Sequence, residues 1–400
     1  MAAAAAFRKI IGATALVLVS VIITLALAEM VLRFTPYAKL RVPNYTYPED
    51  YFVADDVLGY DIAPNVQGKS HSLPAMPYEL FSNRYGCFDY DRDVPQDYTL
   101  ILGDSMTWGY APLEKKWTTR LEELSGEFMA KCGVTGYGTK QELLKGKKVI
   151  EQIGHTPKRI IVMYIVNDLN DDYLMPQRTV YGGKLISWIN NLDLKTGEIN
   201  RRSADEIARK NAKYKDGTWS NTMREWRHGL VVYRLFKIGK ERFSDSIAQI
   251  EEPVIEAQAM RNAEPQKPQL SAASESKELP ETKTESVYRI TLAGYLDTDR
   301  PWFNAAIDAH KQNILSFISY ADSINAKLLF IDPYGLLQHT RFDAVRTAFA
   351  DAPRHSYYNL QDDYYPFDTW ENDAHWNIIG NQTAAKHIHA HAQAIDFYKD

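Results

Sequence analysis

Short apolar runs alternate with longer amphipathic stretches in two parts of the chain, and this alternation limits the possible folds more than any other feature. Runs of strand length occur at 98–102, 128–134, 159–166, 327–332 and near 356–360. Helical stretches are predicted near 117–125, 139–153, 302–324, 341–350 and 378–394. Strands that alternate with helices predict an α/β fold, in which a mostly parallel sheet lies between layers of helices.

The alternation is interrupted by an insertion between about 178 and 296. Its first part predicts a hairpin in LISWINNLDLKTGEIN (185–200) and an amphipathic helix at 221–243. Residues 251–286 are rich in Glu, Pro, Ser and Lys. That composition cannot bury enough apolar surface to offset the entropy of ordering, so we expect disorder there.

The amino terminus predicts a membrane anchor. Residues 10–28 are an uncharged apolar run that follows Arg8 and Lys9, and its length is close to the ~20 residues that cross a bilayer as a helix. Small residues at Ala26 and Ala28 leave a cleaved signal peptide as the alternative. The apolar pattern continues to Phe34, which favours a retained anchor.

The basic residues on the two sides of this run do not decide its orientation. We expect residues 1–9 to be a cytoplasmic tail and the rest of the chain to lie outside the cytoplasm, in the periplasm or at the cell surface of a bacterium. Residues 29–97 are rich in Tyr, Pro and Asp. They predict a stalk and an irregular layer on a main domain at 98–400.

Charge and cysteine content exclude several classes of function. The net charge is −5 with both signs interspersed, so there is no basic surface for nucleic acid. Cys87 and Cys132 are the only cysteines, and they fit either one disulfide or two isolated buried residues. No spacing typical of a zinc site occurs, and we expect neither a metal nor a cofactor.

A Gly-Asp-Ser sequence ending at Ser105 follows the strand at 98–102. A serine between a strand and a helix is exposed by the turn, which makes Ser105 a candidate nucleophile. Its hydroxyl needs a histidine to take its proton and a third group to orient that histidine. His375 lies just before the last helix, and Asp373 is close enough in sequence to reach its Nδ1 and leave Nε2 facing the serine.

Two other strand ends offer donors for an oxyanion. Gly136 lies in a glycine-containing loop, residues 133–139, after the second strand, where the backbone N–H can approach a ligand. Asn167 follows the third strand and can add a side-chain amide.

Taken in order, these blocks resemble those of the SGNH, or GDSL, hydrolase superfamily, over most of 98–178 and 296–400. The resemblance implies a three-layer, flavodoxin-like fold with a parallel five-stranded sheet. It implies hydrolysis or transfer of acyl esters, with Ser105 as the nucleophile and His375 and Asp373 completing the triad. The N–H groups of Ser105 and Gly136 and the side chain of Asn167 would form the oxyanion hole.

The chain departs from the pattern of the superfamily in the acid and in the third block. The usual acid lies three residues before the histidine, where this chain has Asn372, and Val166 replaces a common glycine. An Asp-x-His-Trp sequence also occurs in polysaccharide O-acetyltransferases that resemble this superfamily, so acyl transfer stays open.

We therefore expect a membrane-anchored serine esterase with an acyl-enzyme intermediate. Its substrate would be an O-acylated glycan, in particular an acetylated one, or a lipid-like ester near the membrane. Two alternatives are an O-acyltransferase that uses the same triad with a sugar hydroxyl as acceptor, and a non-catalytic envelope scaffold that keeps the fold.

Overall fold

The computed structural model describes residues 2–35, 37, 47–71, 78–187, 189–193, 196–203, 206–207, 209, 219–236, 294, 296–370 and 373–399. The chain divides into two compact units. The anchor unit comprises residues 1–43 and 213–279, and the sheet unit comprises residues 44–212 and 280–400. The predicted disorder at 251–286 and the position of Asn372 lie outside the described residues.

The sheet unit is built on five parallel strands in the order β13-β12-β7-β5-β6. Their bounds are β5 (Thr99–Gly103), β6 (Met129–Lys131), β7 (Arg159–Met163), β12 (Lys327–Asp332) and β13 (His355–Asn359). Every residue of β5 and β7 is buried, as expected for strands that are covered on both faces. The predicted parallel five-stranded sheet is confirmed.

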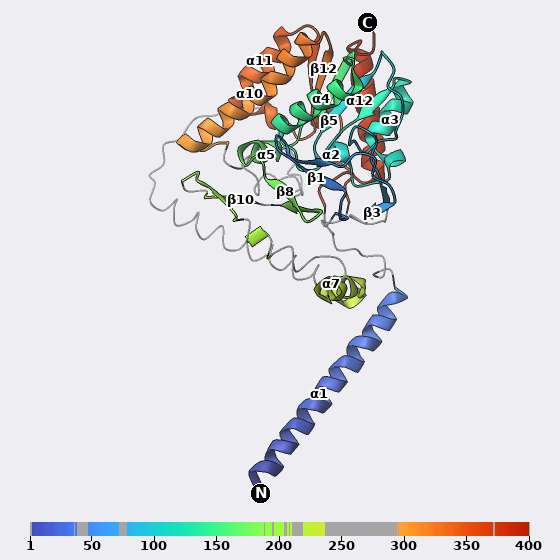
Figure 1. Cartoon of the computed structure of the whole chain (residues 1–400), viewed down its shortest axis with the longest axis vertical. Helices are drawn as coiled ribbons and strands as arrows, with labels where there is room; N and C mark the ends of the chain where they lie inside the picture. Colours follow the sequence, from blue (N-terminus) through green and yellow to red (C-terminus); the bar gives the residue numbers. More distant parts are fainter. Residues whose placement is uncertain are drawn as a thin grey trace, which may run out of the picture. The chain divides into compact units, whose positions relative to one another are not determined.

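Helices cover both faces of this sheet (Figure 1). On one face α3 (Trp117–Ser125) packs against α12 (Ile378–Ala394), and on the other α10 (Pro301–Ser323) packs against α4 (Thr139–Ile153) and α11 (Asp343–Asp351). Shorter helical segments are α2 (Ser105–Trp108), α5 (Asp168–Tyr173), η2 (Leu113–Lys115), η4 (Leu336–Gln338), η5 (Thr340–Phe342) and η6 (Leu360–Asp362). The predicted α/β/α layering is therefore present.

Four antiparallel hairpins surround the sheet in the described part of the unit. They are β1 (Phe52–Asp55) with β2 (Gly59–Ile62), β3 (Lys69–His71) with β4 (Tyr78–Leu80), β8 (Arg178–Tyr181) with β9 (Lys184–Ser187), and β10 (Asn190–Leu192) with β11 (Ile199–Arg201). The last pair largely falls in the segment for which the sequence predicts a hairpin. Strand β8 packs on β1 and β2, so the insertion is joined to the layer that precedes the sheet.

Residues before the sheet form a second, mainly aromatic core. Its buried members include Tyr47, Tyr51, Phe52, Tyr60, Tyr78, Trp108, Tyr110 and Tyr137. Trp108 and Tyr110 come from the segment that follows Ser105, and their rings lie 5.1 Å apart between centroids. Aromatic packing therefore ties the preceding layer to the start of the candidate site.

A disulfide joins Cys87 to Cys132 and settles the alternative that the sequence left open. Cys87 belongs to the layer before the sheet, and Cys132 directly follows β6. The bond thus fixes that layer to one edge of the sheet.

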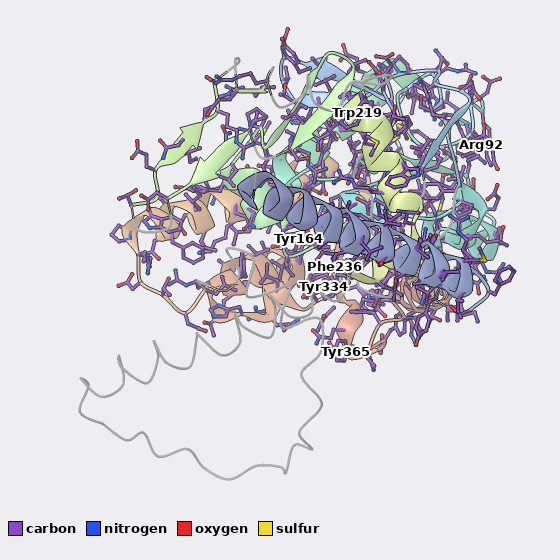
Figure 2. All side chains as sticks on the ribbon, turned by 90° about the horizontal axis from the view of Figure 1, so that it is seen from below. Arg92, Tyr164, Trp219, Phe236, Tyr334 and Tyr365 are labelled. Atoms are coloured by element: carbon purple, nitrogen blue, oxygen red, sulfur yellow. A yellow bond between two sulfur atoms is a disulfide. The ribbon has the colours of Figure 1, made fainter. Side chains whose placement is uncertain are left out.

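The anchor unit contains α1 (Ala2–Arg33), in which Gly12–Arg33 is long and apolar enough to cross a membrane. A second helix, α7 (Trp219–Gly229), is followed by a helical turn at 231–236. The backbone N–H of Val232 donates to Oε2 of Glu29 at 3.0 Å, which links this turn to α1. Trp219 and Phe236, labelled in Figure 2, are 77% and 67% exposed.

Candidate active site

Ser105 begins α2 immediately after β5 and is 8% exposed. The turn depends on Gly103, whose φ is +144° and where a Cβ would lie 2.8 Å from the carbonyl oxygen of Met163. Only glycine adopts this conformation readily in so little space. Asp104 then caps the helix, because its Oδ1 accepts a hydrogen bond from the N–H of Met106 at 2.9 Å.

The Ser105 hydroxyl contacts the predicted histidine. Oγ lies 2.9 Å from Nε2 of His375, although 270 residues separate the two in sequence. On the other side of the ring, Nδ1 lies 2.5 Å from Oδ1 of Asp373. The same carboxylate oxygen accepts the backbone N–H of His375 at 2.8 Å. These contacts fix the ring so that Nε2 faces the serine.

The surroundings of His375 favour its protonated form. Burial lowers the pKa of this imidazole, but the charge and hydrogen bond of Asp373 and the charge of Asp104 outweigh burial, so the pKa is raised above 6.5. The ring of Tyr110 packs edge-on against the imidazole, with 4.3 Å between centroids. Tyr110 is itself held by its hydroxyl, which lies 2.8 Å from that of Tyr47.

Asp104 is a second partner of the serine. Its Oδ2 accepts the Ser105 hydroxyl at 2.9 Å, the same separation as that between Oγ and His375 Nε2. The hydroxyl has one hydrogen, so it can donate to only one of them at a time. When His375 is neutral the hydroxyl can donate to Nε2, and when His375 is protonated Nε2–H donates to Oγ and the hydroxyl turns to Asp104.

Gly136 lies in the loop that follows β6, next to the end of β5. The loop is held there by a hydrogen bond from the Val134 N–H to the carbonyl of Gly103 at 3.0 Å. Gly136 has a φ of +74°, and a Cβ there would lie 2.2 Å from Cζ of Arg178. Glycine is needed here because any other residue would be strained at this positive φ, and because its side chain would displace the guanidinium of Arg178.

Asn167 follows β7 and reaches the serine only through Asp104. Its Nδ2 donates to Oδ2 of Asp104 at 3.1 Å and to Oδ2 of Asp171 at 2.8 Å. Those two contacts use both hydrogens of the amide. The amide must therefore turn, or release a carboxylate, before it can donate to a bound oxyanion.

Further carboxyl groups are buried near this network. Asp168, Asp171 and Glu142 are each no more than 3% exposed. Burial raises the pKa of Asp171 to about 7, against the opposing effects of Arg178 and Asn167. Burial also raises the pKa of Asp168 and Glu142 well above their usual ranges. At neutral pH Asp171 is therefore near its midpoint.

The structure adds one residue that the sequence analysis did not predict. Arg178 is the first residue of β8, in the insertion, and its Nη1 donates to the carbonyl of Thr135 at 3.3 Å. The predicted residues are thus gathered at the carboxyl edge of the sheet. His375 contacts both Ser105 and Asp373. Asn167 is joined to Ser105 through Asp104, and Gly136 lies next to Arg178.

The described residues contain no group of three His, Cys, Asp or Glu side chains placed to hold a metal ion. What they contain is a serine, a base and an orienting carboxylate in hydrogen-bond contact. That arrangement can activate a hydroxyl for attack on an acyl carbon.

No protein-family model and no curated protein sequence matches the chain. Among solved structures it is similar to a lipolytic protein of the G-D-S-L family from Desulfitobacterium hafniense, with 9% identity and a TM-score of 0.33 over 74% of this chain and 99% of that one. It is also similar to an acetyl xylan esterase from the rumen bacterium Butyrivibrio proteoclasticus, with 11% identity and a TM-score of 0.37 over 84% and 73%.

A third similar structure is a carbohydrate esterase family 2 enzyme with a carbohydrate-binding domain from Corynascus thermopiles (Myceliophthora fergusii). The identity is 10% and the TM-score 0.32, over 79% of this chain and 72% of that one. At these identities and TM-scores the likenesses carry no argument about activity. The class defined by the fold and the site is an α/β protein with a Ser-His-Asp array at the carboxyl edge of a parallel sheet.

Proposed function

We propose that this protein is a serine esterase anchored in a membrane, which hydrolyses acyl esters through an acyl-enzyme intermediate. The observation that carries the proposal is the continuous contact from Asp373 through His375 to Ser105. A binding scaffold has no need of a histidine whose Nδ1 contacts an aspartate and whose Nε2 contacts a serine hydroxyl.

In the proposed reaction, Oγ of Ser105 attacks the ester carbonyl while Nε2 of His375 takes its proton. Asp373 stabilises the imidazolium that forms. The carbonyl electrons move to oxygen, and this oxyanion accepts hydrogen bonds from the N–H groups of Ser105 and Gly136 and from Asn167. Collapse breaks the bond to the alcohol, which leaves with the proton from His375.

Water then attacks the acyl-serine, with His375 as base, and releases the acid and Ser105. We propose a short acyl group, such as an O-acetyl group on a glycan. The support is that Ser105 is largely buried and that the Tyr110 ring packs on His375.

A fluorophosphonate probe tests the nucleophile, because it labels only an activated serine. Wild-type protein should be labelled, and Ser105→Ala should fall to background. His375→Ala should lose most labelling, since the hydroxyl then keeps its proton, and Asp373→Ala should lose less. Ser316→Ala on α10 is the control and should label like wild type.

Hydrolysis of a small aryl acetate should show the same order among these variants. Folded wild-type protein that neither labels nor hydrolyses the ester would contradict the proposal and favour a scaffold. Products formed from an acetylated glycan, with and without a sugar acceptor, distinguish hydrolysis from acyl transfer.

The membrane part of the proposal rests on the anchor unit and on the disulfide. Gly12–Arg33 is long enough to span a bilayer, and Trp219, Trp226 and Phe236 of the same unit are exposed. Aromatic residues of this kind are common at membrane interfaces. The Cys87–Cys132 disulfide supports an oxidising compartment outside the cytoplasm.

Two measurements test this placement. A topology reporter fused after Asp400 should report a position outside the cytoplasm. Sequencing the mature amino terminus should find residues before Glu29, and a terminus that begins at Glu29 would show that the segment is cleaved instead.

A further inference from the structure

Arg178 lies against the loop that is proposed to bind the oxyanion. No sequence motif predicts this position. Its Cζ lies 2.2 Å from the place where a Cβ of Gly136 would be. The nitrogen of a residue lies about 2.5 Å from its own Cβ position. The guanidinium is therefore within about 5 Å of the Gly136 nitrogen, the proposed oxyanion donor.

The described residues leave most of the hydrogen-bonding capacity of the Arg178 guanidinium unused. Among the described residues its hydrogen-bond partner is one neutral carbonyl, that of Thr135. Its Nε is buried and has no acceptor among the described residues. A guanidinium carries five N–H donors in a planar fork. Most of this capacity is thus not used by the described residues.

Arg178 also remains charged in these surroundings. Burial lowers the pKa of Arg178, but nearby acidic groups, Asp171 among them, outweigh burial, and the pKa is raised. No carboxylate among the described residues lies within ion-pair distance of it.

The rest of the site is unfavourable to a new negative charge. Oδ2 of Asp104 is 2.9 Å from Ser105 Oγ, and Asp373 is bonded to His375. The Asn167 amide already gives both hydrogens to Asp104 and Asp171. An oxyanion formed at Ser105 would therefore be close to carboxylates, and the Asn167 amide would have to turn before it could donate to it. A cation beside the oxyanion would offset the repulsion from the carboxylates.

We propose that Arg178 is a further catalytic residue, the positively charged donor of the oxyanion hole, supplied by the insertion. The inference rests on the proposed esterase function. When the bond between Oγ and the acyl carbon forms, the carbonyl electrons move to oxygen, and a guanidinium N–H donates to that oxygen. When the tetrahedral intermediate collapses the carbonyl re-forms and the hydrogen bond weakens, while Arg178 keeps its proton throughout.

The carboxylates around Ser105 also favour this role over recognition of an acidic substrate. A permanent negative charge on the substrate would meet Asp104 when it binds. A neutral ester develops its charge only in the transition state, where the guanidinium acts.

The test compares Arg178→Met, Arg178→Lys and Arg178→Ala with wild type on a small neutral aryl acetate. We expect kcat to fall by about 10²-fold in Arg178→Met with little change in KM, as for loss of one oxyanion donor. Arg178→Lys should recover part of kcat because it restores the charge. Guanidinium chloride below denaturing concentrations should raise the rate of Arg178→Ala and leave that of wild type unchanged.

Two controls separate this role from a packing role. Thr179→Ala changes the next residue of the same strand, and Arg120→Met removes an exposed arginine on α3; both should keep the wild-type kcat. If Arg178→Met unfolds, the lysine variant and the guanidinium rescue still decide the question.

Several outcomes would overturn the inference. One is a wild-type kcat in folded Arg178→Met or Arg178→Ala. Another is a variant in which KM rises only for an ester that carries a carboxylate, which would make Arg178 a substrate-binding group. Both of these outcomes are measured on an enzyme that is active in its wild-type form. If the proposed function itself is wrong, wild type will instead show no more activity than Ser105→Ala.

Discussion

Asp104 lies as close to the Ser105 hydroxyl as His375 does. Which of the two accepts the hydroxyl hydrogen therefore depends on pH. Attack on an ester requires neutral His375, with the hydroxyl hydrogen directed at Nε2. The negative charge of Asp104 raises the pKa of His375 and so favours the state in which the histidine cannot act as a base. Asp104 also caps α2, which gives a structural reason for an acid next to the serine.

Asp104→Asn should move the acidic limb of kcat/KM to lower pH. Activity is lost as the pH falls through the pKa of His375, which is raised above 6.5 in the folded protein. Asparagine keeps an oxygen for the helix cap but removes the charge that raises this pKa. The measurement is a pH profile of aryl acetate hydrolysis, with exposed Glu123→Gln as the control. A limb that stays in place or moves to higher pH would contradict this role.

Asn167→Ala should lower kcat by about 10²-fold with little effect on folding, if the amide turns to the oxyanion during the reaction. Its two contacts with Asp104 and Asp171 suggest a second, positioning contribution. Asp168→Ala is the comparison, because Asp168 is fully buried and its Oδ2 accepts the Ile165 N–H at 3.1 Å. That variant should lose thermal stability more than turnover. Unchanged kcat in Asn167→Ala would remove Asn167 from the oxyanion hole.

The sequence allowed some of these residues to be predicted because their positions follow from strand ends. Ser105, Gly136, Asn167 and His375 come after parallel strands, whose carboxyl ends meet at one edge. Arg178 could not be predicted in this way, since it comes from an insertion and reaches the site through tertiary packing. The roles of all these residues stay predictions, whereas their proximity is a feature of the structure.

At the scale of elements, the disulfide is a covalent cross-link, in addition to the backbone, between the layer before the sheet and the sheet itself. It joins residues 45 positions apart in sequence. Because closing such a loop reduces the entropy of the unfolded chain, Cys87→Ser with Cys132→Ser should lower the free energy of unfolding by about 2–4 kcal/mol.

Denaturant unfolding of the sheet unit measures this effect, and wild type treated with reductant should unfold at a similarly lowered midpoint. Equal midpoints for the double variant and the oxidised wild type would show that the bond adds no stability. Oxidised and reduced double variant should behave alike, since Cys87 and Cys132 are the only cysteines.

Element bounds were predictable where the hydrophobic period was unbroken. The helix at 139–153 and the strand at 327–332 have the predicted bounds. The strand predicted at 159–166 ends earlier, at Met163. The next three residues are apolar and buried as well, so the apolar run continues after the chain has turned toward Asn167. The β8–β9 hairpin was missed, but Gly182 and Gly183 at its turn, both with positive φ, are a recognised hairpin signal.

At the scale of the whole molecule, the proposed chemistry and the proposed anchor belong to different units. Every residue of the Ser-His-Asp array, the disulfide and Arg178 lie in the sheet unit, and the apolar helix lies in the anchor unit. Among the residues whose burial the structure describes, the cores of the sheet unit begin at Tyr47 and include none from α1. Esterase chemistry should therefore not depend on the membrane helix.

A variant that lacks residues 1–43 should stay in the aqueous fraction, unfold at the wild-type temperature and hydrolyse a small soluble aryl acetate with unchanged kcat. The truncation removes no residue of the sheet unit, so all contacts within that unit, in its core and at the site, are kept. Hydrolysis of an ester presented on a vesicle should fall instead, because the anchor no longer raises the concentration of enzyme near its substrate. The same truncation carrying Ser105→Ala gives the background rate for both substrates. If the truncated protein is folded but inactive on the soluble ester, the anchor unit contributes to the site itself, and the separation of anchor from chemistry would be wrong.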